Sequence, residues 1–235
     1  MRFDPSTRTW TQYKNPTQKS KLGSTATYGA AGDSDGNGWL SQHPIGIMVK
    51  HNSQTGKSED VVVPKRVPEM DLFSGEDRRI FQMMGGSLYQ GHGHPEEQAI
   101  RKPGGGPGPT DAVWGPGWIG DNLVKIDIRT NKATLYPFPW PDAGAYQATV
   151  DKDGIVWVVF TNADAVGRFD PRTEKWTMYQ LPTLGTETHG MQVVTVNGRP
   201  MLMVPEWASG KAARLEFRTN EELQALKAQV QRQVR

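Results

Sequence analysis

Two stretches of this chain, residues 28–63 and 146–181, repeat the same pattern of residues. Each contains an Asp-x-Asp-Gly turn followed by a Trp-led apolar segment, and matching positions are 118 residues apart, as for Trp39 and Trp157. A third copy lies 43 residues before the second, with Trp114, Lys125, Ile126 and Asp127 at the positions of Trp157, Arg168, Phe169 and Asp170. A chain built from such units folds each unit in the same way, so this repeat restricts the architecture more than any single residue does.

Each unit reads as four short strands separated by turns. In the copy at 146–181, Asp and Gly residues at 151–154 favour a tight turn between the first two strands. Periods of about 40 to 45 residues with several short strands per unit are typical of β-propeller blades. The alternative, a sandwich whose hairpins merely look alike, is disfavoured because three copies share their spacing. The sequence predicts sheets that lie side by side around an axis, over 28–64, 111–138, 146–182 and 189–217.

Composition agrees with a repeat fold that lacks one large central core. The chain has 235 residues, of which 26 are Gly and 17 are Pro, and only 36% are apolar. Blades tolerate this composition because each blade buries its faces mainly against its neighbours. The 8 Trp residues suit such packing, since their side chains are flat and large. We therefore predict an all-β fold, a β-propeller of four to five recognisable blades over residues 1–217.

Charge and residue usage exclude several classes of function. The net charge is +2, and the basic residues are scattered rather than arranged in a stripe with exposed aromatic residues, so we expect no nucleic-acid partner. The absence of cysteine excludes disulfides and thiolate chemistry. No run approaches the roughly 18 apolar residues of a membrane-spanning helix, so we expect no membrane span.

The N-terminus repeats the middle of a unit, since residues 3–11 match residues 169–177. Two explanations compete. Either strand 9–13 completes the last blade and closes a ring, or the chain is part of a longer product whose first blades and export signal precede it. The last unit has its own third strand at 213–217, which makes residues 2–4 redundant in a closed ring and favours a fragment or a shortened ring. We expect an exported or periplasmic protein if the chain is a fragment of a longer precursor, and a cytoplasmic one otherwise.

Residues 65–110 interrupt the repeat and read as an insertion in one connection between blades. Acidic residues at 76–77 followed by apolar ones predict one short helix there. The remainder is rich in Gly, and we expect it to be the least regular part of the chain. His92, His94, Glu96 and Glu97 carry metal-ligating groups, but a solvated polar loop is the better interpretation because no regular element fixes their spacing.

The strongest chemical constellation lies in the last unit. His189 falls where the other units carry Tyr146 and Tyr28, at the entry to the innermost strand. Glu206 falls where the first unit carries Gln42, at the end of the Trp-led strand. Both positions approach the mouth of the central channel in propellers, so we expect a small-molecule or peptide-like ligand there. An imidazole beside a carboxylate can act as a general base with an orienting group or a metal ligand; the alternative is that His189 caps a strand and Glu206 is a rim carboxylate.

These residues resemble a known family. The repeated phrases, an aromatic residue or Pro-His-Gly-Ile, then Asp-Gly-x-x-Trp, Ile-Gly-Arg and Leu-Pro, are similar to those of the streptogramin B (virginiamycin B) lyase family over most of the chain except 65–110. The resemblance implies a seven-bladed propeller, of which this chain is a fragment or a shortened form. It also implies opening of a cyclic depsipeptide antibiotic by elimination at its ester linkage, with a divalent metal, typically magnesium.

The family pattern also implies roles for individual residues. Its final blade carries Glu-x-His-Gly and a Glu on the next strand, which match Glu187, His189 and Glu206 here, whereas Tyr146 stands where the family has a further His. The resemblance implies that His189 removes a proton and that Glu187 and Glu206 hold Mg²⁺ or orient the imidazole. Tyr146, Tyr28 and Gln42 are then candidate substrate contacts. The alternative is a non-catalytic propeller, a binding or scaffold module of a larger exported protein.

The C-terminus changes character after residue 217. A Thr followed by acidic residues and then good helix formers predicts a helix over about 220–233. Leu223, Leu226 and Val230 give it a thin apolar stripe. Residues 218–235 are thus expected to form a helical tail that lies on the propeller rim or in solvent.

Overall fold

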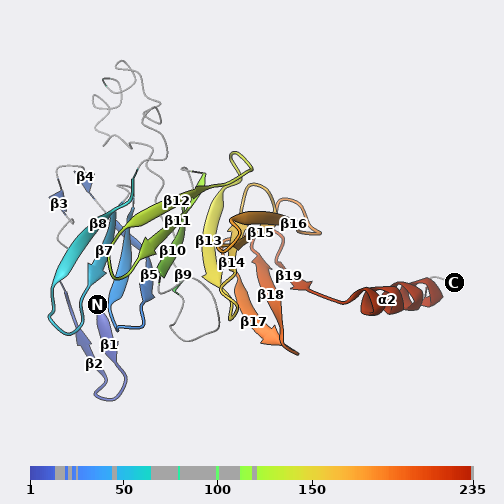
Figure 1. Cartoon of the computed structure of the whole chain (residues 1–235), viewed down its shortest axis with the longest axis horizontal. Coiled ribbons are helices and arrows are strands. Elements are labelled where there is room, and N and C mark those ends of the chain that lie inside the picture. The colour runs from blue at the N-terminus through green and yellow to red at the C-terminus, as the bar shows by residue number, and fades with distance from the viewer. Residues whose placement is uncertain are drawn as a thin grey trace.

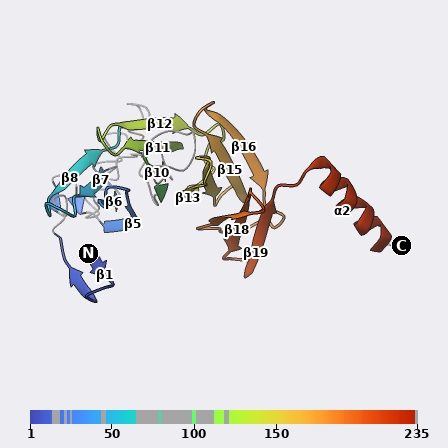
Figure 2. The same ribbon diagram turned by 60° about the horizontal axis from the view of Figure 1, so that its bottom comes forward.

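The computed structural model describes residues 1–13, 19–20, 23–24, 26–43, 47–64, 79, 99–100, 112–117 and 121–233. Within them, antiparallel sheets follow one another along the chain, and a single helix ends it (Figure 1). Figure 2 shows these sheets side by side along an open arc, with strand β1 near one end and strand β19 near the other. The predicted propeller-like arrangement is confirmed, and two stacked sheets are excluded.

Three sheets have four strands in the simple up-and-down order. They comprise β5 (Ala26–Gly32), β6 (Gly38–His43), β7 (Ile47–His51) and β8 (Ser58–Val62); β9 (Ala99–Ile100), β10 (Ala112–Gly117), β11 (Asn122–Asp127) and β12 (Ala133–Pro137); and β13 (Ala145–Val150), β14 (Val156–Phe160), β15 (Ala165–Asp170) and β16 (Lys175–Gln180). The smaller sheets comprise β17 (Gln192–Val196), β18 (Arg199–Glu206) and β19 (Lys211–Glu216); β1 (Arg2–Asp4) and β2 (Thr9–Thr11); and β3 (Lys19–Ser20) and β4 (Gly23–Ser24).

The turn that opens the Trp-led strand is held by one aspartate in two of the sheets. Asp151 Oδ1 accepts hydrogen bonds from the amides of Asp153 and Ile155, and its Oδ2 accepts one from Trp157 Nε1 at 2.9 Å. Gly154 has a φ of 80°, which favours glycine because a Cβ strains this backbone. The turn before Trp39 in the first sheet is built in the same way, with the indole 2.8 Å from Asp33 Oδ2. The repeated motif therefore encodes a local hydrogen-bonded turn.

The core lies between sheets rather than at one centre. Trp39 packs with Val113, Val124 and other residues of the next sheet. Trp114 packs in the same way against the β13–β16 sheet, and Trp157 against the β17–β19 sheet. The three indoles are at most 2% exposed. Each of these three sheets thus packs a large aromatic side chain against its neighbour, which explains how a chain of modest apolar content builds a core between sheets.

The structure adds one strand to the sheet expected over 111–138. Residues 99–100, within the segment expected to be an insertion, form β9 and pair antiparallel with β10 at Trp114 and Val113. This strand occupies the place in the blade that β5 and β13 occupy in theirs. Arg79 is helical, in the segment expected to form the short helix. The rest of residues 65–110, including the remainder of that segment and the His- and Glu-bearing loop, lies outside the described residues.

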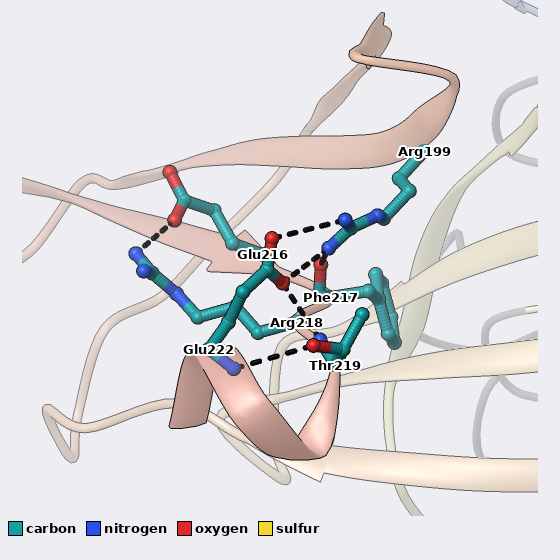
Figure 3. A network of polar contacts seen from close by, with 6 residues as sticks. All are labelled: Arg199, Glu216, Phe217, Arg218, Thr219 and Glu222. Atoms are coloured by element: carbon teal, nitrogen blue, oxygen red, sulfur yellow. Dashed lines mark hydrogen bonds and ion pairs between the residues drawn. The ribbon is translucent and has the colours of Figure 1, made fainter. Parts of the chain in front are cut away.

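The predicted C-terminal helix is confirmed as α2 (Asn220–Gln233), which extends away from the sheets (Figure 1). A capping box starts it, because Glu222 N donates to Thr219 Oγ1 and Thr219 N donates to Glu222 Oε2 at 2.7 Å. Arg199 donates to both carboxylate oxygens of Glu222 and to the carbonyl of Phe217, as Figure 3 shows. This contact ties the start of the helix to the β17–β18 hairpin. No helix among the described residues is long and apolar enough to cross a membrane.

Candidate functional site

Three rings meet where the last two sheets adjoin. His189 stacks on Tyr146 with ring centroids 4.4 Å apart and planes 13° apart. The indole of Trp207 meets the same imidazole edge-on, with centroids 4.9 Å apart. Tyr146 is buried, His189 is half-buried and Trp207 is 68% exposed. The structure therefore brings together two of the predicted residues and adds an aromatic residue that the sequence interpretation did not include.

A β-bulge places Tyr146 in this group. In the β13–β14 pairing Ala145 lies opposite Phe160 and Gln147 opposite Val159, so Tyr146 is the extra residue. Bulges re-aim one side chain out of the strand alternation and are frequent beside functional sites. The β5–β6 pairing has a similar irregularity between Thr27 and Ala30, where Tyr28 lies. Tyr28 and Tyr146, which occupy the same position of the repeat, thus both lie at an irregularity in the pairing of the innermost strand.

The segment that carries His189 is held by Asp164, at the start of the β15 hairpin. Asp164 accepts hydrogen bonds from Gly185 N, Thr186 N and Thr186 Oγ1 at 2.6–2.7 Å. Burial raises the pKa of Asp164, but the hydrogen bonds from Thr186 and Gly185 together outweigh burial and leave the pKa below its ordinary value. Thr161 Oγ1 also donates to the carbonyl of Thr188 at 2.8 Å. The connection before His189 is therefore pinned to the preceding blade by side chains.

The residues after His189 are fixed by Gln147. Its Oε1 accepts a hydrogen bond from Met191 N at 2.5 Å. A Cβ at Gly190 would lie 3.2 Å from the same oxygen, tighter than most Cβ contacts, so a larger residue there would make the Gln147 side chain shift by a few tenths of an ångström. His189 is thus held on both sides along the chain as well as by the two rings.

Glu206 ends β18 and is only 2% exposed. Its Oε2 accepts a hydrogen bond from Ser209 Oγ at 2.9 Å, which closes the turn that follows the strand. Ala208 N in that turn donates to the carbonyl of Thr186 at 3.0 Å. Glu206 therefore supports the turn that presents Trp207, and the turn is linked to the segment that carries His189.

The expected carboxylate ligands do not gather around His189. Glu187 is exposed and has a φ of 45°, a backbone conformation uncommon for a residue with a side chain. Among the residues that the structure describes, no three His, Asp or Glu side chains lie close enough together to hold a metal ion. The arrangement of Glu187, His189 and Glu206 thus does not fit a preassembled magnesium site, and Mg²⁺ stays a prediction.

The remaining predicted residues lie in the first four-stranded sheet. Gln42 is fully buried on β6, and its Nε2 donates to Thr27 Oγ1 at 3.2 Å. Tyr28 lies on β5 of the same sheet. Two other sheets of the arc separate them from His189 and Trp207. The repeat gives these positions equivalent places in their blades, but it does not bring them to one site.

No protein-family model and no curated protein matches the chain. Among solved structures, a catalytically inactive His-to-Ala variant of virginiamycin B lyase from Staphylococcus aureus with quinupristin is similar at a TM-score of 0.61 and 18% identity. The match covers 81% of this chain and 52% of that one. A streptogramin B lyase structure matches at a TM-score of 0.60 and 17% identity, covering 91% of this chain and 60% of the other.

These similarities define the class of fold. The chain is a β-propeller-like protein, and its arrangement of sheets is similar to that of the streptogramin B lyases. It spans 52% and 60% of the lengths of those two chains.

Proposed function

We propose that the chain is a lyase-like propeller protein that binds a peptide-like ester beside His189 and uses this imidazole as a base in an elimination. The observation that carries the proposal is the position of His189, held between Tyr146 and Trp207 on a segment pinned by Asp164. A base must be oriented before it can take a proton efficiently, and both rings restrict the imidazole. In the similar virginiamycin B lyase structure a His-to-Ala variant is described as catalytically inactive.

The reaction balances without a co-reactant. The imidazole of His189 accepts the proton on the carbon next to a carbonyl, and the electrons of that C–H bond form a carbon–carbon double bond. The C–O bond of the ester on the adjacent carbon breaks, and its oxygen leaves with the electron pair as a carboxylate. Negative charge develops on the carbonyl oxygen as the proton leaves, so a donor aimed there lowers the barrier.

A second candidate function is binding without turnover. The observation that favours it is the separation of the carboxylates, since Glu187 is exposed at the surface while Glu206 is buried and bonded to Ser209. A propeller with this arrangement retains an aromatic surface for a ligand but has no assembled set of charged groups around the base. Many unrelated functions use this fold, so the fold alone does not distinguish elimination from binding without turnover, and the site residues must be tested.

The deciding experiment incubates the protein with a streptogramin B depsipeptide and separates cyclic from linear product by chromatography and mass spectrometry. His189→Ala and His189→Gln remove the base, and the second keeps a planar polar side chain. Exposed Lys152→Ala serves as the matched control for handling and folding. Elimination is supported if the unaltered protein forms linear product and both His189 variants form none while their thermal unfolding is unchanged. Saturable binding without linear product supports the binding function, and folded protein that neither binds nor turns over the depsipeptide contradicts both.

A further inference from the structure

The geometry points to Trp207 as a stacking platform for an aromatic side chain of the ligand. This inference deepens the proposed function and rests on the same site. Tyr146, His189 and Trp207 form a series of ring contacts that begins in the core and ends at the surface. The last ring is 68% exposed, so most of the indole remains available to a further ring.

The exposed indole stands on a rigid support. Its turn is closed by the contact between Ser209 Oγ and Glu206 Oε2, and the amide of Ala208 joins it to Thr186, whose amide and hydroxyl are bonded to Asp164. Thr186 and Glu206 are both almost fully buried. A surface that is already ordered loses little conformational entropy when it binds, so an aromatic contact there yields a larger net affinity.

Neighbouring groups define the kind of ligand. Leu184 lies two residues before Thr186 along the chain and is a further exposed apolar side chain of this segment, at 76% exposure. Glu187 directly follows Thr186, and its exposed carboxylate is an acceptor for N–H groups. An offset or edge-on aromatic pair contributes more than the apolar area it buries, so an aromatic partner gains more from the indole than an aliphatic one of similar size. The combination fits a peptide-like ligand with an aromatic side chain next to amide N–H groups.

The experiment follows the indole Nε1–H signals by nitrogen-15 NMR, with the Trp207 signal assigned from its loss in Trp207→Phe. N-acetyl-phenylalanine amide is the probe, and N-acetyl-leucine amide is the aliphatic comparison. Trp10 is the matched control because its indole is 66% exposed in the β1–β2 hairpin, away from the site. We expect the aromatic probe to shift the Trp207 signal and not the Trp10 signal. Trp207→Ala should weaken its binding by about two- to tenfold, while Trp207→Phe retains most of it.

Equal shifts with both probes, equal shifts at Trp10, or unchanged binding by Trp207→Ala would overturn the inference. The assay needs no turnover, so its outcome is separate from that of the proposed function. If the depsipeptide is opened, Trp207→Ala should raise KM and also lower kcat, because the indole contacts the ligand and restricts the imidazole of His189. Trp207→Phe keeps a ring at this position and should retain most of both. Turnover with an unaltered KM in Trp207→Ala would contradict the stacking platform but not the elimination. Binding of the aromatic probe at Trp207 without turnover of the depsipeptide would contradict the elimination but not the stacking platform.

Discussion

Removing the carboxylate of Asp164 should release the segment that carries His189. Asp164 has a φ of 47°, so Asp164→Gly deletes the side chain without straining the backbone, whereas Ala would add strain. Thr186 is fully buried, and the change removes the acceptor of both its amide and its hydroxyl. A buried donor left unsatisfied costs about 1–3 kcal/mol, so we expect a loss of about 2–4 kcal/mol in the free energy of unfolding after partial relaxation.

Two measurements check this expectation. Urea denaturation gives the free energy of unfolding, and amide hydrogen exchange reports the local opening of Gly185 and Thr186. Asp164→Asn is the matched variant, because it keeps one oxygen acceptor and tolerates a positive φ, and it should lose less than half as much. A loss below about 0.5 kcal/mol in Asp164→Gly, with unchanged exchange at both amides, would refute the argument that this carboxylate holds the site.

The same carboxylate gives a pH dependence with a defined sign. Its folded pKa lies below the ordinary 3.8, so its contribution is fully present above that value. The contribution is lost as the pH falls through the lowered folded pKa. Exchange at Thr186 should therefore accelerate, relative to other buried amides, only on the acid side of pH 3.8.

Three further predictions follow from other contacts. Trp157→Phe should cost about 1–3 kcal/mol, because the buried indole loses its bond to Asp151 Oδ2 and leaves a gap between two sheets; urea denaturation measures it. Hydrogen bonds from Arg199 and from a backbone amide lower the pKa of Glu222 from 4.5 to about 2. The first turn of α2 should thus keep this support above pH 4.5 and lose it as the pH falls toward 2, as followed by far-UV circular dichroism. Gly167→Ala should cost about 1–3 kcal/mol in thermal unfolding, because its Cβ would lie 2.4 Å from the Phe160 ring.

Matched variants isolate each cause. Trp10→Phe alters an exposed indole and should change stability by less than about 0.5 kcal/mol, so an equal loss at Trp10 and Trp157 would count against the buried hydrogen bond. Arg199→Ala should move the acid transition of α2 upward toward pH 4.5, and an unmoved transition contradicts the role given to Arg199. Gly38→Ala introduces a Cβ with only ordinary contacts, so Gly167→Ala should be clearly less stable than it.

Only part of the candidate site is predictable from the sequence. His189 and Tyr146 were found because the repeat gives them equivalent places at the entry to an innermost strand, and a bulge at Tyr146 accompanies their contact. Trp207 had no such signal, since it follows Glu206 in a turn outside the repeated phrases. Asp164 lies in a turn and no sequence feature marks it. Its role depends on a neighbouring segment that lies beside it in space and about twenty positions later in the chain.

The sequence by itself determined the blades. Turn residues, alternating strands and a Trp at a fixed place in each unit act locally or between adjacent units, so a repeated pattern yields a repeated structure. It also determined the capped helix at the C-terminus, because its capping box lies within four residues. Tertiary structure decided which side chains meet at the site. Glu187, His189 and Glu206 belong to the same unit of the repeat, yet their environments differ. Glu187 has a positive φ, His189 stacks on a ring, and buried Glu206 accepts a hydrogen bond from a hydroxyl. Spacing along the chain carries no information about these three-dimensional contacts.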